Sequence, residues 1–128
     1  MQQVALEEEK RSLSACYYTK FSDVTVSGGG QWTPGEEVTV EGNLVFDMLG
    51  IWENAGGMTV TLTFGGQTYT TQTSLSVSSQ YGFVFKFTVP QLPFGNYQAT
   101  LSFAGWTPPW VIGCLSPCTY TFQVTVTG

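Results

Sequence analysis

The sequence contains no histidine, and only 10% of its 128 residues carry a charged side chain. Without histidine, Ser–His and Cys–His nucleophilic pairs and histidine-liganded metal sites are excluded. Between Asn54 and Gly128 the only charged side chain is that of Lys86. The second half of the chain must therefore stay in solution through neutral Thr, Ser, Gln and Gly residues, a composition that suits an extracellular or virion surface.

Carboxylates are the remaining groups that could carry catalysis, and all nine of them precede residue 54. A glycosidase-like pair requires two acids that face one cleft. Glu37, Glu41 and Asp47 instead occur at the alternate positions that would form the solvated face of a strand. Asp47 and Glu53 flank a loop, but no calcium-loop signature accompanies them. We therefore expect a protein that is not an enzyme and that holds no metal or cofactor.

The charge balance and the apolar runs limit the kinds of partner. A net charge of −5 with four scattered cations lacks the basic cluster that nucleic acid requires. No apolar run approaches the roughly 20 residues that cross a bilayer as a helix. The first residues also lack the basic start and apolar segment of a secretory signal. We expect neither a nucleic-acid partner nor a transmembrane segment.

Alternation of apolar and polar residues is the dominant pattern after residue 15. In "GFVFKFTV", Phe83, Phe85, Phe87 and Val89 fall on one face of an extended strand. The same period predicts further strands within 17–26, 37–46, 58–64, 67–73, 74–77, 97–103 and 119–128. Seven or eight short strands separated by turn residues predict an all-β antiparallel sandwich over residues 16–128.

The positions between these strands carry more specific predictions. A change of phase near Ser22 and Asp23 predicts a bulge in the first strand. Segments 28–36 and 48–57 are predicted as loops because they are rich in glycine and other turn residues. Trp32 in the first loop is expected to cap the core. The last strand is expected to point four side chains inward: Tyr120, Phe122, Val124 and Val126.

Three segments, "PGEEVTVEGNL", "TVTLTFGGQTYTT" and "GFVFKFTVPQLPFGNYQATLSFAG", resemble bacterial and archaeal extracellular immunoglobulin-like repeat domains over about residues 34–127. The resemblance implies an immunoglobulin-like sandwich that serves as a spacer, an adhesion module or an assembly subunit, without shared catalytic residues. The chain departs from that pattern in its N-terminal extension and in the cysteine-bearing loop before its last strand. The features that carry the resemblance are Gly82, the Phe83-to-Val89 alternation, Pro90, Leu92, Pro93, Gly95 and Tyr97.

Residues 1–15 differ in composition from the rest and are predicted to form an N-terminal arm. The segment "LEEEKRSL" places Glu7 and Arg11 four residues apart, a spacing that supports a helix, although so short a helix is marginal in water. Three interpretations remain: a frayed tail, an arm that becomes ordered on a neighbouring subunit, or a helix packed on its own domain. The residues that would make the subunit contact are Val4, Leu6, Glu7, Arg11 and Leu13.

The stretch "GWTPPWVIGCLSPC" over 105–118 combines large apolar side chains with three prolines. It could plug one end of the sandwich, contact another subunit, stack on a sugar or touch a membrane. Trp52 in the 48–57 loop faces the same choice, and it would join the same patch if the two loops lie at one end. The contact residues of these aromatic loops are Trp52, Trp106, Trp110, Val111 and Ile112.

The three cysteines leave one thiol over in any bridged state. Cys16 could pair with Cys114 or with Cys118, and the topology of immunoglobulin-like sandwiches would bring the first and last strands together. Cys114 and Cys118 could also pair with each other because only three residues separate them, or all three thiols could stay free. Four ligands are usual for a zinc–thiolate site, so zinc is not expected.

These features predict a non-catalytic structural or interaction protein. The leading hypothesis is a self-assembling subunit or decoration of a virion, or of a cell-surface filament or layer, with copies of itself or other structural subunits as partners. The alternative is a monomeric adhesion or carbohydrate-binding module that uses its loop tryptophans to bind glycans.

Overall fold

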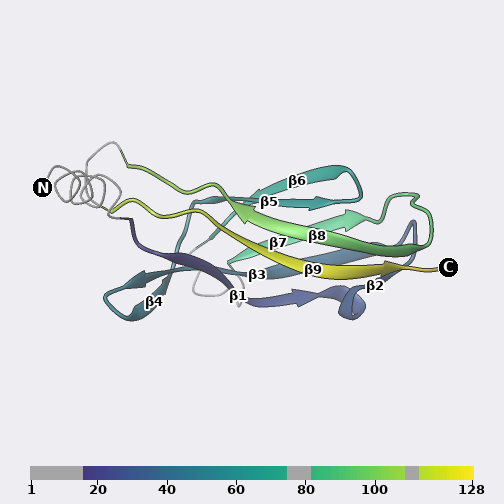
Figure 1. The fold of residues 1–128 in the computed structure, drawn as a ribbon, viewed down its shortest axis with the longest axis horizontal. Coiled ribbons are helices and arrows are strands. Elements are labelled where there is room, and N and C mark those ends of the chain that lie inside the picture. The colour runs from purple at the N-terminus through teal and green to yellow at the C-terminus, as the bar shows by residue number, and fades with distance from the viewer. Residues whose placement is uncertain (1–15, 75–81, 109–112) are drawn as a thin grey trace, which may run out of the picture.

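The computed structural model describes residues 16–74, 82–108 and 113–128, which form an all-β structure of two facing sheets (Figure 1). No α-helix occurs in these residues, and therefore none that is long and apolar enough to cross a membrane. The strands are β1 (Thr19–Val26), β2 (Gln31–Trp32), β3 (Glu37–Met48), β4 (Ile51–Asn54), β5 (Thr59–Phe64), β6 (Gln67–Gln72), β7 (Phe83–Thr88), β8 (Gly95–Phe103) and β9 (Cys118–Val126).

The first sheet is organised around the long strand β3. Strand β1 pairs antiparallel with one edge of β3, while β7 and β4 share the other edge. The pairing of β1 with β3 shifts register between Ser22 and Thr25, and Asp23 has a φ of +53°. The predicted bulge is therefore confirmed, and it explains why the apolar phase of the sequence changes at this point.

The second sheet has the order β2-β9-β8-β5-β6. Its pairs are antiparallel except that of β2 and β9, which run parallel. The Gly65–Gly66 turn joins β5 to β6 with φ values of +59° and +78°, as a type I′ turn requires. Strand β6 lies at the edge of the sheet, as its weaker apolar pattern predicted.

The core lies between the two sheets and is filled by the alternating residues that the sequence singled out. Phe83, Phe85, Phe87 and Val89 are buried. Phe87 of the first sheet stacks on Tyr69 of the second, with ring centroids 4.4 Å apart. These contacts hold the two sheets together. Each Å² of apolar surface that they remove from water stabilises the folded state by roughly 25 cal/mol.

Both segments that were predicted as loops contain strands. Segment 48–57 includes β4, which returns along β3 as a hairpin. Segment 28–36 includes most of a 3₁₀ turn (Ser27–Gly30) and the short strand β2. The described residues therefore hold nine strands rather than seven or eight, and one pair is parallel. The expected strand at 74–77 lies almost entirely outside the described residues.

The inner face of the last strand is fully buried over only part of its length. Val124 and Val126 are buried as expected, and Phe122 is half-buried. Tyr120 lies on the same face of the sheet, since it pairs with the buried Leu101, but its side chain is 39% exposed. The predicted direction of Tyr120 is therefore consistent with the register, and its burial is incomplete.

Candidate interaction surface

A disulfide between Cys16 and Cys114 fixes the start of the described chain to the segment before β9. Their Cα atoms are 4.5 Å apart, and 98 positions separate them in the sequence. The Tyr17 amide also donates to the Cys114 carbonyl at 2.9 Å, and the Ser116 amide donates to the Tyr17 carbonyl at 3.0 Å. The sequence left this pairing open among several alternatives, and the structure selects Cys16–Cys114.

Cys118 keeps a free thiol at the first position of β9. Burial raises the pKa of the Cys118 thiol above its usual value, and a side-chain hydrogen bond with Thr19 lowers it by a smaller amount. A thiol with a raised pKa carries little thiolate at neutral pH, and the thiolate is the nucleophilic form. The Cys118 side chain also packs against the buried core between the sheets.

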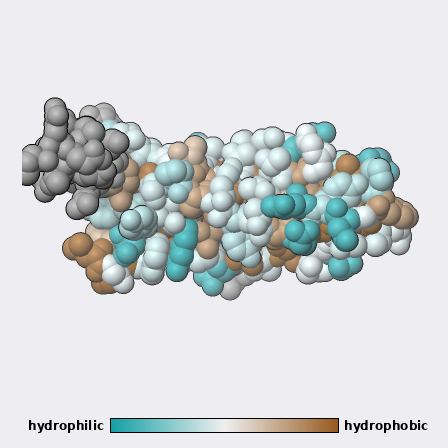
Figure 2. Space-filling view, viewed as in Figure 1, coloured by the Kyte–Doolittle hydropathy of each residue, from teal (hydrophilic) through white to brown (hydrophobic). Residues whose placement is uncertain are grey.

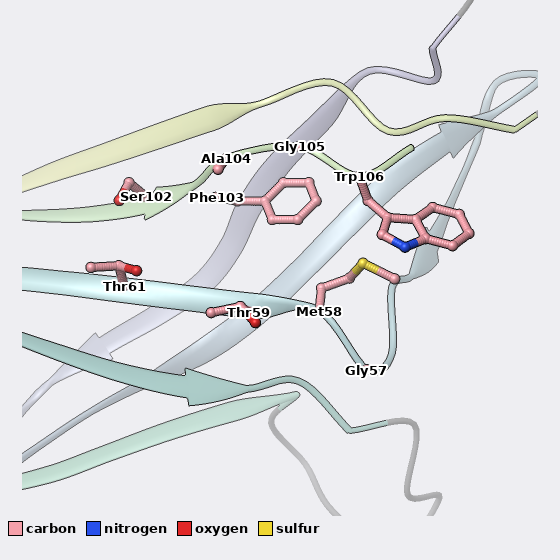
Figure 3. A pocket seen from close by; sticks show the side chains of 9 residues that line it. All are labelled: Gly57, Met58, Thr59, Thr61, Ser102, Phe103, Ala104, Gly105 and Trp106. Atoms are coloured by element: carbon pink, nitrogen blue, oxygen red, sulfur yellow. The ribbon is translucent and has the colours of Figure 1, made fainter. Parts of the chain in front are cut away.

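Trp106 lies beside the disulfide-linked segment. Its backbone exchanges two hydrogen bonds with Leu115, at 3.0 and 2.8 Å, while its side chain remains 38% exposed. Figure 3 shows the Trp106 indole next to the side chain of Met58, at the mouth of a pocket of about 330 Å³ that continues along β5 and β8. Sequence reasoning had not singled out Met58 as a site residue, because its alternation marks it only as a core position.

A second pocket of about 400 Å³ opens at the same end of the molecule and shares Trp106 and Met58 with the first. We call it the apolar pocket. None of the described residues that line it carries an acidic or basic side chain. Its large side chains are those of Tyr17, Phe46, Met48, Met58, Trp106 and Leu115.

The turn between β3 and β4, residues 48–52, forms what we call the hairpin tip. Leu49 is 94% exposed and Ile51 is 65% exposed, and Met48 and Trp52 are also exposed. The hairpin extends from the lower left of Figure 1, where Figure 2 shows an apolar patch. Sequence reasoning named only Trp52 here, although "MLGIW" places four apolar residues in five positions between Asp47 and Glu53.

Trp52 and Trp106 lie at the same end but not in one patch. Trp52 pairs with Asp47, whereas Ile51 pairs with Met48, and successive residues of a strand point to opposite faces. Met48 lines the apolar pocket with Trp106, so Trp52 lies on the other face of the sheet. There the Lys20 Nζ atom is 4.2 Å from the centroid of the Trp52 ring.

The remaining predicted contact residues cannot be placed. The arm residues Val4, Leu6, Glu7, Arg11 and Leu13 lie outside the described residues, as do Trp110, Val111 and Ile112. Within the described ranges, no group of three or more Asp, Glu or Cys side chains could hold a metal ion.

No family model matches the chain, and neither a curated protein nor a solved structure matches it. Its function must therefore be argued from its own geometry. The described surface offers two complementary features at one end: a pocket without charged side chains and a protruding apolar turn.

Proposed function

We propose that this chain is a non-catalytic structural subunit that assembles with copies of itself or with other structural subunits outside the cell. The observation that carries the proposal is the gathering of exposed apolar side chains at one end, where the hairpin tip and Trp106 lie on either side of the apolar pocket. Exposed apolar surface of this kind marks interaction sites in soluble proteins. Residues 1–15 join the described chain at the same end, through the disulfide-linked Cys16.

The immunoglobulin-like form of the sandwich belongs to this proposal. Its support is the connectivity, in which β1 pairs in one sheet and β2 crosses to run parallel to β9 in the other. A first strand that divides between the two sheets in this way is compatible with that fold. Domains of this type serve as scaffolds for many unrelated functions, so the fold alone does not define the role.

An extracellular surface or a virion is the proposed location. The Cys16–Cys114 disulfide fits an oxidising compartment, where such bonds form and persist. The near absence of charge after residue 54 suits a densely packed layer or filament, in which neighbouring copies would otherwise repel. Both properties are compatible with a virion decoration and with a cell-surface assembly.

Deleting residues 1–15 while keeping Cys16 should lower the mass of the assembly measured by light scattering. The reason is that Val4, Leu6 and Leu13 would supply the apolar contacts of the arm to a neighbouring subunit. A second variant keeps the full length and changes only these three residues to serine. It should lower the mass of the assembly to a similar extent, which would assign the effect to the apolar side chains rather than to the length of the arm. An assembly mass unchanged by either variant would remove the arm from the proposal.

A carbohydrate-binding or adhesion role is the second candidate, because the half-exposed Trp106 indole lines both pockets. Under this alternative, the protein binds a saccharide on a glycan array, and Trp106→Ala together with Trp110→Ala abolishes the signal. Trp52→Ala serves as the control, since Trp52 faces away from the pockets. The structural-subunit proposal predicts no saccharide signal that depends on Trp106 or Trp110.

A further inference from the structure

We infer that the hairpin tip of one copy inserts into the apolar pocket of a second copy, and that the second copy returns the same contact. This inference rests on the proposed self-assembly and names the surface that performs it.

The two-residue hairpin places Leu49 in a backbone conformation that is unfavourable for leucine, and the Gly50 amide donates to Asp47 Oδ1 at 2.7 Å within the same turn. Leu49 has a φ of +53° and is followed by Gly50 at +91°, so the turn has the left-handed backbone of a type I′ turn. A residue other than Gly, Asn or Asp in this region costs about 1–2 kcal/mol. The Leu49 side chain recovers none of this cost by burial, because it is 94% exposed. Strain at an exposed apolar residue is expected where the residue is needed for binding.

The pocket has the chemistry to receive such a tip. Its volume is about 400 Å³, and the apolar side chains that line it include Phe46, Met58 and Trp106. Its described lining residues carry no acidic or basic side chain, so an entering aliphatic side chain would displace water without stripping a charge of its hydration from any of them. Methionine and tryptophan are residue types that adapt to and strengthen apolar contacts.

The tip and the pocket are adjacent in one molecule, and Met48 belongs to both. Two copies that meet end to end about a two-fold axis would therefore each present a tip to the pocket of the other. A two-fold interface uses the same patch on both copies and closes after two subunits. The apolar tip and the uncharged pocket thus make a second copy of this chain the fitting occupant.

The charges near the tip disfavour a lipid surface as the alternative partner. Asp47 and Glu53 flank the tip, and Lys20 is the cation that the structure places against it, over the Trp52 ring. Biological membranes carry negative surface potential and attract clusters of basic residues rather than acidic ones. A pocket without charge on a second copy imposes no such repulsion.

Leu49→Asn tests the inference because it separates binding from folding. Asparagine tolerates the left-handed region and favours type I′ turns, so this variant should keep or raise the melting temperature. Loss of one buried leucine weakens association by about 10- to 100-fold. The substitution removes two such leucines from the dimer, because each copy inserts one tip into the other. Sedimentation velocity over a rising protein concentration should therefore show self-association for the wild type and a monomer for Leu49→Asn.

A mixing experiment tests the pairing of tip with pocket. Trp106→Ser removes one wall of the pocket and should also weaken self-association. A mixture of Leu49→Asn with Trp106→Ser should associate more strongly than either variant alone, since one intact tip can meet one intact pocket. Equal weakness in the mixture would overturn the reciprocal arrangement.

Phe94→Ser is the matched control, because Phe94 is 68% exposed and lies at the opposite end, next to the pairing of Gly95 with Val126. It should leave the association constant unchanged. A wild type that stays monomeric at every concentration would refute both the inference and the proposed assembly. Wild-type association that Leu49→Asn leaves intact would refute the inference alone. Leu49-dependent binding to phosphatidylcholine–phosphatidylserine vesicles, with self-association unaffected, would also overturn it and assign the tip to a membrane.

Discussion

Replacing Cys16 and Cys114 together with serine should lower the free energy of unfolding by about 4–5 kcal/mol. The bond closes a loop spanning 98 positions, and cross-linking such a long loop removes a large conformational entropy from the unfolded chain. The native contacts around it, including the hydrogen bonds of Tyr17 with Cys114 and Ser116, should persist in the folded variant. Urea unfolding of the oxidised wild type and the double variant measures the difference as a lower midpoint.

Cys118→Ser is the control for this experiment. Cys118 forms no disulfide and is only half-buried, so its replacement should change the stability far less than loss of the bridge. Reduction of the wild type should reproduce the result of the double variant. If the double variant retained the wild-type midpoint, the disulfide would contribute nothing to the stability of the fold.

Trp32→Ala should lower the free energy of unfolding by about 3–5 kcal/mol, the usual range for truncating a buried aromatic side chain. Trp32 is 1% exposed and packs edge-on against Phe64 and Phe87, with centroid distances of 5.0 and 5.6 Å. Its indole also donates to the Ser27 carbonyl at 3.0 Å, so truncation leaves that acceptor without this donor. Thermal unfolding followed by circular dichroism would measure the loss.

Trp52→Ala provides the comparison at an exposed tryptophan. Its ring is 42% exposed, and its contact with Lys20 belongs to the class of exposed cation–π contacts, which contribute about 0.5–1 kcal/mol. The Trp32 variant should therefore lose several times more stability than the Trp52 variant. Equal losses would mean that Trp32 does not fill the core between the sheets.

The strands with regular alternation could be predicted from the sequence because successive side chains of a strand point to opposite faces. In a sheet with one buried face, apolar residues therefore recur at every second position. Phe83, Phe85 and Phe87 are buried while Val84 and Lys86 between them are exposed. The alternation therefore identified the inner face of this strand, although it did not identify the strands that pair with it. The partners themselves follow from tertiary packing, which alternation does not encode.

The hairpin of β3 and β4 was missed for an identifiable reason. Type I′ turns are recognised by Asn-Gly, Asp-Gly or Gly-Gly, whereas this turn has Leu49 before Gly50. The residues around it are apolar without alternation, so neither the turn signal nor the strand signal was present. The violation of local preference at Leu49 is one reason to assign a binding role to the hairpin tip.

The candidate site could be predicted only as a set of apolar loop residues. Cys16, Cys114 and Cys118 all lie near one end, and the path of the chain around Leu115 decides which pair bonds. The sequence also could not show that Trp52 and Trp106 occupy different faces, because this depends on the register of β4 on β3. The pocket itself combines residues from several segments distant in sequence, which alternation cannot bring together.

Hydrogen–deuterium exchange of the wild-type protein at low and high concentration tests most directly whether this end is the docking surface. We predict that higher concentration slows exchange of the backbone amides in the hairpin tip and beside Leu115, while amides next to Phe94 exchange at the same rate. Exchange that is independent of concentration at both ends would contradict the account.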